Sequence, residues 1–188
     1  MKPLCVYNVI SPNDDFFCAS FIHVDTNKQM ICYVLDGDSS NTDILLRSIK
    51  QCSLIGFNNK NYDDILLNYI AYQKDVNTKE IHALSEALMD LKEKGLQPWQ
   101  DKDISFYASI EVDSIDLSYV ITMDDNQCPK EAITDTLKTY CVDRSFKILD
   151  ALKRFKEIQH YGFKKDYKNV DIHMNYMNNR IGLTNNEL

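Results

Sequence analysis

The run GFNNKNYDD, residues 56–64, lies between two segments with different hydrophobic patterns. The apolar run CSLI (52–55) leads into it, and the amphipathic run ILLNYIAY (65–72) follows it. A short apolar run indicates a buried strand and apolar residues at helical spacing indicate a helix, so the polar residues are expected at a strand-to-helix corner. Asparagine and aspartate are common caps at such corners, and Asp63 or Asn61 could simply hold the first amides of the helix.

The length and composition predict one globular domain over residues 1–188. The chain contains 44% hydrophobic and 26% charged residues, as ordinary globular proteins do. No apolar run approaches the roughly 20 residues of a membrane-spanning helix, and the N-terminus lacks the apolar core of a signal peptide. We therefore expect no membrane association and a cytoplasmic location. The net charge of −7 argues against indiscriminate binding to nucleic acid, which relies on Lys and Arg.

The cysteines and histidines indicate neither a disulfide framework nor a zinc site. Cys5, Cys18, Cys32 and Cys52 lie in apolar, strand-like runs, and the chain has no CxxC pair. These four residues are predicted to be buried free thiols. The four histidines lack the i, i+4 spacing that places two metal ligands on one helix face.

The order of the predicted elements indicates an α/β fold, with a mixed sheet flanked by helices. Three strands rich in β-branched and aromatic residues are separated by short turns, which favours antiparallel pairing; they span 4–10, 16–25 and 30–36. The next elements are expected to be a helix over 41–51, a strand over 53–58, helices over 63–73 and 77–95, and a short strand over 112–121. Residues 96–111 show no regular pattern and are expected to be an irregular connection.

The C-terminal third is expected to be helical. Residues 128–141 and 143–162 predict two helices or one broken helix, and the polar tail 171–188 could be a final helix with a frayed end. The core is therefore expected over 4–155, followed by a helical and polar tail over 156–188. Within this part, the run 152–168 alternates cations with aromatic residues. It is either a solvated helix face with its loop or a surface that stacks on bases.

The corner contains a spaced pattern of Asn, three residues, an aromatic residue and Asp, which Asn58, Tyr62 and Asp63 fill. Gly56 and Phe57 precede it, and the run SIDL (114–117) follows on the next predicted strand. Together with the order of the elements, these residues resemble the proofreading 3′–5′ exonuclease domain of family B DNA polymerases, particularly polymerase-like proteins of bacteriophages. The resemblance covers residues 4–155 and implies the ribonuclease H-like fold.

Most metal ligands of that family are replaced in this chain. The family uses four acids, because two divalent cations about 4 Å apart activate water and stabilise the leaving oxygen. The family's Asp-x-Glu on the opening strand corresponds here to Asn8 and Ile10, and its last motif gives Tyr140 with Arg144 where Asp is expected. An arginine cannot ligate a metal and repels one by its charge. Asp143 lies one residue earlier, about 100° around a helix, so its carboxylate is expected to point away.

The count of charges therefore predicts no bound metal, no cofactor and no catalytic residue, since Asp63 and at most one further aspartate stand against Asn8, Ile10 and Arg144 at the other positions. Asp14 and Asp15 could replace the lost acids, but they fall in the turn after the first strand, several residues from the expected ligands. Magnesium also requires near-ideal octahedral geometry. If the protein were an active enzyme, Asp63 and Asp143 would be its Mg²⁺ ligands.

Three functions follow from this resemblance. The preferred one is a catalytically inactive exonuclease-fold protein of phage origin that binds a protein in the host cytoplasm, such as an inhibitor of a host defence nuclease, for example a CRISPR effector. An acidic protein can be steered towards the basic nucleic-acid channel of such an enzyme. The alternatives are an active Mg²⁺-dependent 3′–5′ exonuclease and an inactive domain that binds single-stranded nucleic acid. The predicted binding residues are Asn58, Tyr62, Tyr140 and Arg144.

Overall fold

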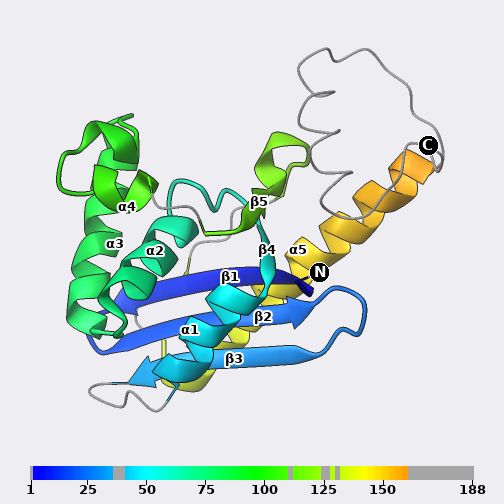
Figure 1. Cartoon of the computed structure of the whole chain (residues 1–188), viewed down its shortest axis with the longest axis horizontal. Coiled ribbons are helices and arrows are strands. Elements are labelled where there is room, and N and C mark those ends of the chain that lie inside the picture. Colours follow the sequence, from blue (N-terminus) through cyan, green and yellow to red (C-terminus); the bar gives the residue numbers. More distant parts are fainter. Residues whose placement is uncertain (1, 36–40, 110–111, 124–127, 130–131, 161–188) are drawn as a thin grey trace.

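Five strands form one mixed sheet in the computed structural model, which describes residues 2–35, 41–109, 112–123, 128–129 and 132–160. The strands are β1 (Leu4–Asn13), β2 (Phe16–His23), β3 (Gln29–Leu35), β4 (Ser53–Gly56) and β5 (Ser114–Asp116). They lie in the order β3-β2-β1-β4-β5 (Figure 1). β1 with β2 and β2 with β3 pair antiparallel, whereas β1 with β4 and β4 with β5 pair parallel. The predicted α/β class and the antiparallel opening strands are confirmed.

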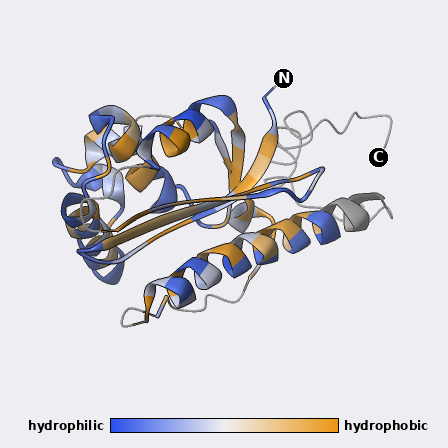
Figure 2. Cartoon of the chain, turned by 90° about the horizontal axis from the view of Figure 1, so that it is seen from below, coloured by the Kyte–Doolittle hydropathy of each residue, from blue (hydrophilic) through white to orange (hydrophobic). Residues whose placement is uncertain are grey.

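Helices cover both faces of this sheet (Figure 2). One face carries α1 (Thr42–Gln51), α2 (Asp63–Gln73), α3 (Thr78–Glu93) and the short α4 (Ser105–Ser109). The other face is crossed by α5 (Thr134–His160), a helix of 27 residues. Two 3-10 helices, η1 (Pro98–Gln100) and η2 (Leu117–Tyr119), lie in the connections. The helices predicted over 41–51, 63–73 and 77–95 are confirmed, with ends that differ by at most two residues.

β1 is buried on both faces because successive side chains of a strand point to opposite sides of the sheet. Tyr7 and Val9 pack in the core beneath α1, α2 and α3. Val6 and Ile10 face the other way, into the apolar clusters that α5 completes. Two-sided burial explains why the opening strands form continuous apolar runs instead of alternating with polar residues.

Three predicted segments differ from the structure. The strand expected over 112–121 is limited to β5 (Ser114–Asp116), because the chain turns into η2 at Leu117. Residues 96–111 are not irregular throughout, since η1 and α4 lie within them. The two helices or broken helix expected over 128–141 and 143–162 are one continuous helix that begins only at Thr134. Cys141 and Val142, at the expected break, are buried, and no glycine or proline occurs between Thr134 and His160. Packing against the sheet therefore carries the helix through the polar Asp143–Arg144 pair.

Other expectations concern the cysteines and the C-terminal residues. All six cysteines are free, and Cys5, Cys18, Cys32 and Cys52 are buried, as predicted. In the run 152–168, Leu152 and Phe155 pack in the apolar cluster under the sheet. Residues 161–168 of that run and the tail 171–188 lie outside the described residues. Within the described part of the chain, no helix combines the length and apolar character needed to cross a membrane.

Candidate functional site

The corner between β4 and α2 depends on a close approach at Gly56. A Cβ atom at this position would lie 2.6 Å from the Cβ of Asn59, whose side chain is fully buried. Only glycine leaves room for that side chain. The chain then turns at Asn58, whose φ of 56° is in the left-handed region that asparagine enters more readily than most residues. The glycine and the asparagine are therefore needed for the local path of the chain.

The aspartate of the SIDL run holds this corner in place. Asp116 lies at the end of β5, and its carboxylate accepts hydrogen bonds from the backbone N–H groups of Asn58 (2.8 Å) and Lys60 (3.3 Å). It also accepts one from the N–H of Ser118 at the start of η2 (2.9 Å). One carboxylate thus ties the loop after β4 to the loop after β5, which is why both strands end at the same level.

Asp64 is the centre of a buried polar network beneath the corner. Its carboxylate accepts hydrogen bonds from the hydroxyl of Tyr7, the side-chain amide of Asn59 (3.1 Å) and the hydroxyl of Ser114 (2.6 Å). The ammonium of Lys60 lies 3.2 Å away and supplies the opposite charge. Burial and the nearby Asp64 and Asp63 charges raise the pKa of the Tyr7 hydroxyl. Asp64 therefore has a structural role: it holds α2 against β1 and β5.

The first amides of α2 are not capped by the side chains that the sequence suggested. The N-cap is Tyr62, and it makes no side-chain capping hydrogen bond. The backbone carbonyl of Asn59 instead accepts from the N–H groups of Tyr62 (3.2 Å) and Asp64 (2.9 Å). The interpretation of Asp63 or Asn61 as a capping residue is thus wrong, because the tight turn itself satisfies these amides.

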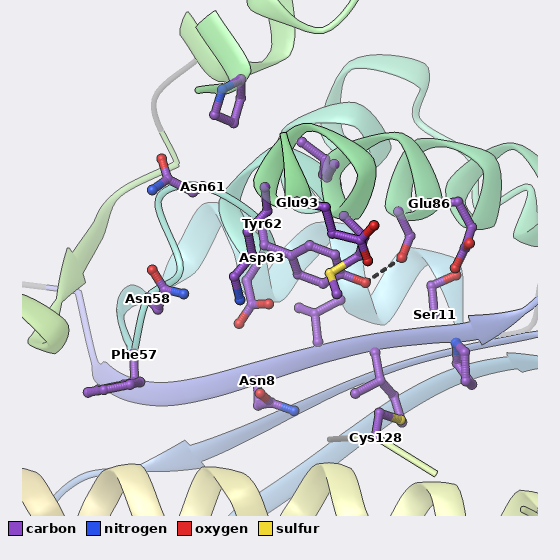
Figure 3. A pocket seen from close by; sticks show the side chains of 18 of the residues that line it. Asn8, Ser11, Phe57, Asn58, Asn61, Tyr62, Asp63, Glu86, Glu93 and Cys128 are labelled. Carbon is purple, nitrogen blue, oxygen red and sulfur yellow. Dashed lines mark hydrogen bonds between the residues drawn. The ribbon is translucent and has the colours of Figure 1, made fainter. Parts of the chain in front are cut away.

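Asp63 has no such structural role. Its side chain is buried, with 7% exposure, yet its carboxylate accepts no hydrogen bond from the described residues. Figure 3 shows it pointing from the start of α2 towards β1, where Asn8 lies. Burial raises the pKa of this carboxyl well above its ordinary value, the Asp64 charge adds to the effect, and the Arg144 guanidinium opposes it. An unpartnered buried acid of this kind is typical of functional sites.

Asp63 faces a cavity of about 630 Å³ between β1, the corner, α3 and α5. The cavity is of the size that small ligands occupy in proteins. Its walls combine aromatic rings with amides and charges; those named by the sequence analysis are Asn8, Ile10, Asn58, Tyr62, Asp63, Tyr140 and Arg144. Tyr62 is fixed by a hydrogen bond between its hydroxyl and that of Ser85, drawn as a dashed line in Figure 3. Residues that are far apart in the sequence thus line one cavity.

Three predicted acids do not line this cavity. Asp143 is exposed on α5, whereas Arg144, the next residue, contributes to the lining. Asp14 and Asp15 lie in the exposed turn between β1 and β2. The Asp14 carboxylate is 3.7 Å from Nε2 of His82 on α3, so it faces the protein surface instead of Asp63.

The sequence analysis missed the wall that α3 provides. Glu86, Met89 and Glu93 line the cavity from this helix, and Cys128 lines it from the segment before α5. The signal in the sequence is weak: the three α3 residues recur at i, i+3 and i+7, which places them on one helix face. That face mixes charges with a methionine and resembles any solvated helix surface.

The residues around Asp63 do not fit a pair of divalent cations. Two metal ions need several converging oxygen ligands, most of them anionic. Beside Asp63 the cavity has the amide of Asn8, the alkyl side chain of Ile10 and the cation of Arg144. Within the described residues, no three His, Cys, Asp or Glu side chains are grouped closely enough to hold a metal ion.

Comparison of the chain with protein-family models, with curated proteins and with solved structures gave no match.

Proposed function

We propose that this chain is a non-catalytic binding protein built on an exonuclease-like scaffold of the ribonuclease H-like type. The strand order β3-β2-β1-β4-β5, with three antiparallel strands followed by parallel ones, is compatible with that scaffold. The corner residues Asn58, Tyr62 and Asp63 lie at the carboxyl end of β4, where α/β sheets commonly carry their sites.

The observation that carries the proposal is the setting of Asp63. It is a buried carboxylate that faces the cavity, and the Arg144 guanidinium is the positive charge that acts on its pKa. A guanidinium beside the carboxylate lowers the attraction of the cavity for a dication and offers donors to a carboxylate or phosphate. The cavity is therefore suited to recognition and not to two-metal hydrolysis.

The partner we propose is a protein, and specifically a host defence nuclease such as a CRISPR effector, with the chain being of phage origin and acting in the host cytoplasm. The physical support is the net charge of −7, which favours encounter with the basic nucleic-acid channel of a nuclease. Addition of the chain to such a nuclease should slow cleavage of its target, and the effect should weaken as salt is raised.

The test of the non-catalytic proposal is a nuclease assay on the purified chain. Labelled single-stranded DNA is incubated with Mg²⁺ or Mn²⁺ and either the parent chain, Asp63→Ala or Asp143→Ala. We expect no metal-dependent shortening by any of the three. Shortening by the parent that Asp63→Ala abolishes would overturn the proposal and support an active enzyme. Retained shortening in both variants indicates a contaminating nuclease, which repurification of the parent should remove.

A second candidate, binding of single-stranded nucleic acid without cleavage, is favoured by the aromatic and cationic lining of the cavity. Phe57, Tyr62 and Tyr140 supply ring faces for stacking, and Lys92 and Arg144 supply positive charge. This function predicts binding of a labelled oligonucleotide that weakens with salt and is reduced by Tyr140→Ala and Arg144→Ala. Unchanged binding in both variants would argue against the cavity as the binding surface.

A further inference from the structure

Two cysteines from different elements lie in direct contact. Cys5 is on β1, and Cys52 links the end of α1 to the start of β4. Their sulfur atoms are 3.6 Å apart, with the Cys5 thiol donating to the Cys52 sulfur. Both residues are largely buried, at 6% and 9% exposure, but they keep more contact with solvent than the 0–1% of Cys18, Cys32 and Cys141.

The surroundings make Cys52 the nucleophile of the pair. The Cys5 thiol donates a hydrogen bond that favours the Cys52 thiolate, and the Lys2 ammonium adds positive charge, so the pKa of Cys52 falls to about 7 despite burial. The same hydrogen bond and burial raise the pKa of Cys5. Lys2 is held nearby by Asp113, 3.6 Å away. A thiolate beside a thiol is the arrangement of an attacking and a resolving cysteine.

The other described cysteines are placed differently. Cys18 and Cys141 are a second pair joined by a side-chain hydrogen bond, but neither has exposed surface. The Cys141 sulfur also contacts the backbone carbonyl oxygens of Asn8 (3.4 Å) and Cys18 (3.8 Å). Cys32 is buried in the core at 1% exposure, and Cys128 lines the cavity. Contact between two sulfurs together with access from solvent therefore distinguishes Cys5 and Cys52.

We propose that Cys5 and Cys52 are a modification site at which a hydroperoxide oxidises the two thiols to a reversible disulfide. The Cys52 thiolate attacks one peroxide oxygen, the O–O bond breaks, and hydroxide or alkoxide leaves. Cys52 becomes a sulfenic acid. The Cys5 sulfur then attacks the Cys52 sulfur, the S–O bond breaks, and the Cys5 proton leaves with the hydroxyl as water. Two thiols are oxidised and one peroxide is reduced.

The position of the pair connects it to the cavity. Cys5 is three residues before Asn8 on β1, and Cys52 is four residues before Gly56 at the end of β4. These parallel neighbours carry the floor of the cavity and the corner. A bond between the two sulfurs would hold together the amino-terminal ends of both strands, and it should slow local opening at the edge that leads to Asp63.

The test is peptide mapping of the full chain after hydrogen peroxide treatment. Thiols are counted, alkylated with iodoacetamide and located by mass spectrometry. We expect free thiols to fall from six to four, with one peptide pair linked through Cys5 and Cys52 that dithiothreitol releases. The oxidised chain should melt about 5 °C higher or more, because a bond closing a long loop restricts the unfolded chain. In Cys5→Ser, Cys52 should instead be trapped by dimedone as a sulfenic acid.

Three outcomes would overturn the proposal. The first is oxidation of Cys128 while Cys5 and Cys52 remain reduced. The second is accumulation of Cys52 as a sulfinic acid in the parent chain, which would mean that Cys5 does not resolve it. The third is a link between Cys18 and Cys141 in place of the expected one. Because the mapping is carried out on the parent chain, the result does not depend on a variant that folds.

Discussion

At the scale of single residues, the corner separates side chains that build the fold from one that does not. Contacts and hydrogen bonds hold the corner together: Gly56 lies against Asn59, Asn59 donates to Asp64, and Asp116 accepts from the backbone of the corner. Asp63, between them in sequence, has no such partner among the described residues and faces the cavity. Neighbouring aspartates thus differ in role because consecutive helix residues point about 100° apart.

The close contact at Gly56 gives a first prediction. Gly56→Ala places a Cβ 2.6 Å from Asn59, whose side chain is fully buried and cannot move away freely. We expect a loss of about 1–3 kcal/mol in the free energy of unfolding, measured by urea denaturation. Amide exchange at Tyr62 and Asp64 should also accelerate. Gly95→Ala is the comparison: nothing lies within 4 Å of its added Cβ, so its cost comes from its φ of 68° alone and is confined to the end of α3. Equal acceleration of the Tyr62 and Asp64 amides in this variant would contradict the account.

The buried carboxyl of Asp63 gives a pH-dependent prediction. Its pKa is raised in the folded state, so the folded chain binds the proton more tightly than the unfolded chain. Stability should therefore fall as pH rises from about 4 towards the folded pKa, by at most about 1.4 kcal/mol per pH unit from this group. Asp63→Asn removes that loss. The free energy of unfolding of the variant minus that of the parent should therefore be larger at pH 8 than at pH 4. The measurement is urea denaturation at both pH values.

The matched control for that experiment is Asp143→Asn, the same change at an exposed position on α5. It should alter stability by less than about 0.5 kcal/mol at either pH. If the difference in free energy of unfolding between Asp63→Asn and the parent is the same at both pH values, the pKa of Asp63 is not raised in the folded state.

At the scale of elements, the sequence predicted those whose pattern follows from local chemistry. α2 was predicted over its full range because Ile65, Leu66, Tyr69 and Ile70 recur at helical spacing and all four are buried. α5 was predicted with a break, since the polar residues around Asp143 suggest a new helix start. Its continuity comes from Cys141 and Leu137 packing on Ile10 and Cys18 of the sheet, contacts between residues more than 100 positions apart.

The candidate site, like the set of helices, was predictable only in part. Asn8, Asp63 and Arg144 line one cavity, a placement that only the resemblance to the exonuclease family implied. The roles of Asp64 and Asp116 were not foreseen, because they depend on Tyr7 and on the backbone of the corner, which no spacing in the sequence reveals. The α3 wall was missed because its charged face has no distinguishing pattern.

The link between β5 and the corner gives a third prediction. Asp116→Ala leaves the N–H groups of Asn58, Lys60 and Ser118 without their acceptor. We expect a loss of about 2–4 kcal/mol, because several hydrogen bonds to a charged acceptor are removed together. Hydrogen exchange followed by mass spectrometry should show faster exchange over 57–62 and 117–120. Asp150→Ala, at an exposed position of α5, should leave those segments unchanged.

At the scale of the whole molecule, the lining of the cavity leads to an expectation about metals, because Asn8, Ile10 and Arg144 offer no carboxylate beside Asp63. Addition of Mg²⁺ or Mn²⁺ to the parent chain should shift its melting temperature by less than about 1 °C, since a ligand that does not bind the folded state does not stabilise it. The measurement is a thermal melt with metal and with EDTA. A metal-dependent rise of several degrees in the parent would contradict the fit described above.

The same assay can test the scaffold itself. A triple variant with Asn8→Asp, Ile10→Glu and Arg144→Asp adds three carboxylates around Asp63. It should be less stable than the parent in EDTA and gain about 5–10 °C on saturation with Mn²⁺, because binding would relieve the repulsion among the acids. Absence of any gain in a folded variant would indicate that the cavity does not have the shape of a metal site.

The placement of α5 has a consequence for how the chain reaches its final form. Val6, Ile22 and Ile55 of the sheet lie in one apolar cluster with residues of α5 that are synthesised last among the described core residues, namely Ile148, Leu149, Leu152 and Phe155. A nascent chain that ends before Thr134 leaves that sheet face open to water. The part of the chain before α5 therefore leaves the ribosome with an exposed apolar sheet face. The interval before α5 is synthesised is the time at which binding of a chaperone would protect the chain most.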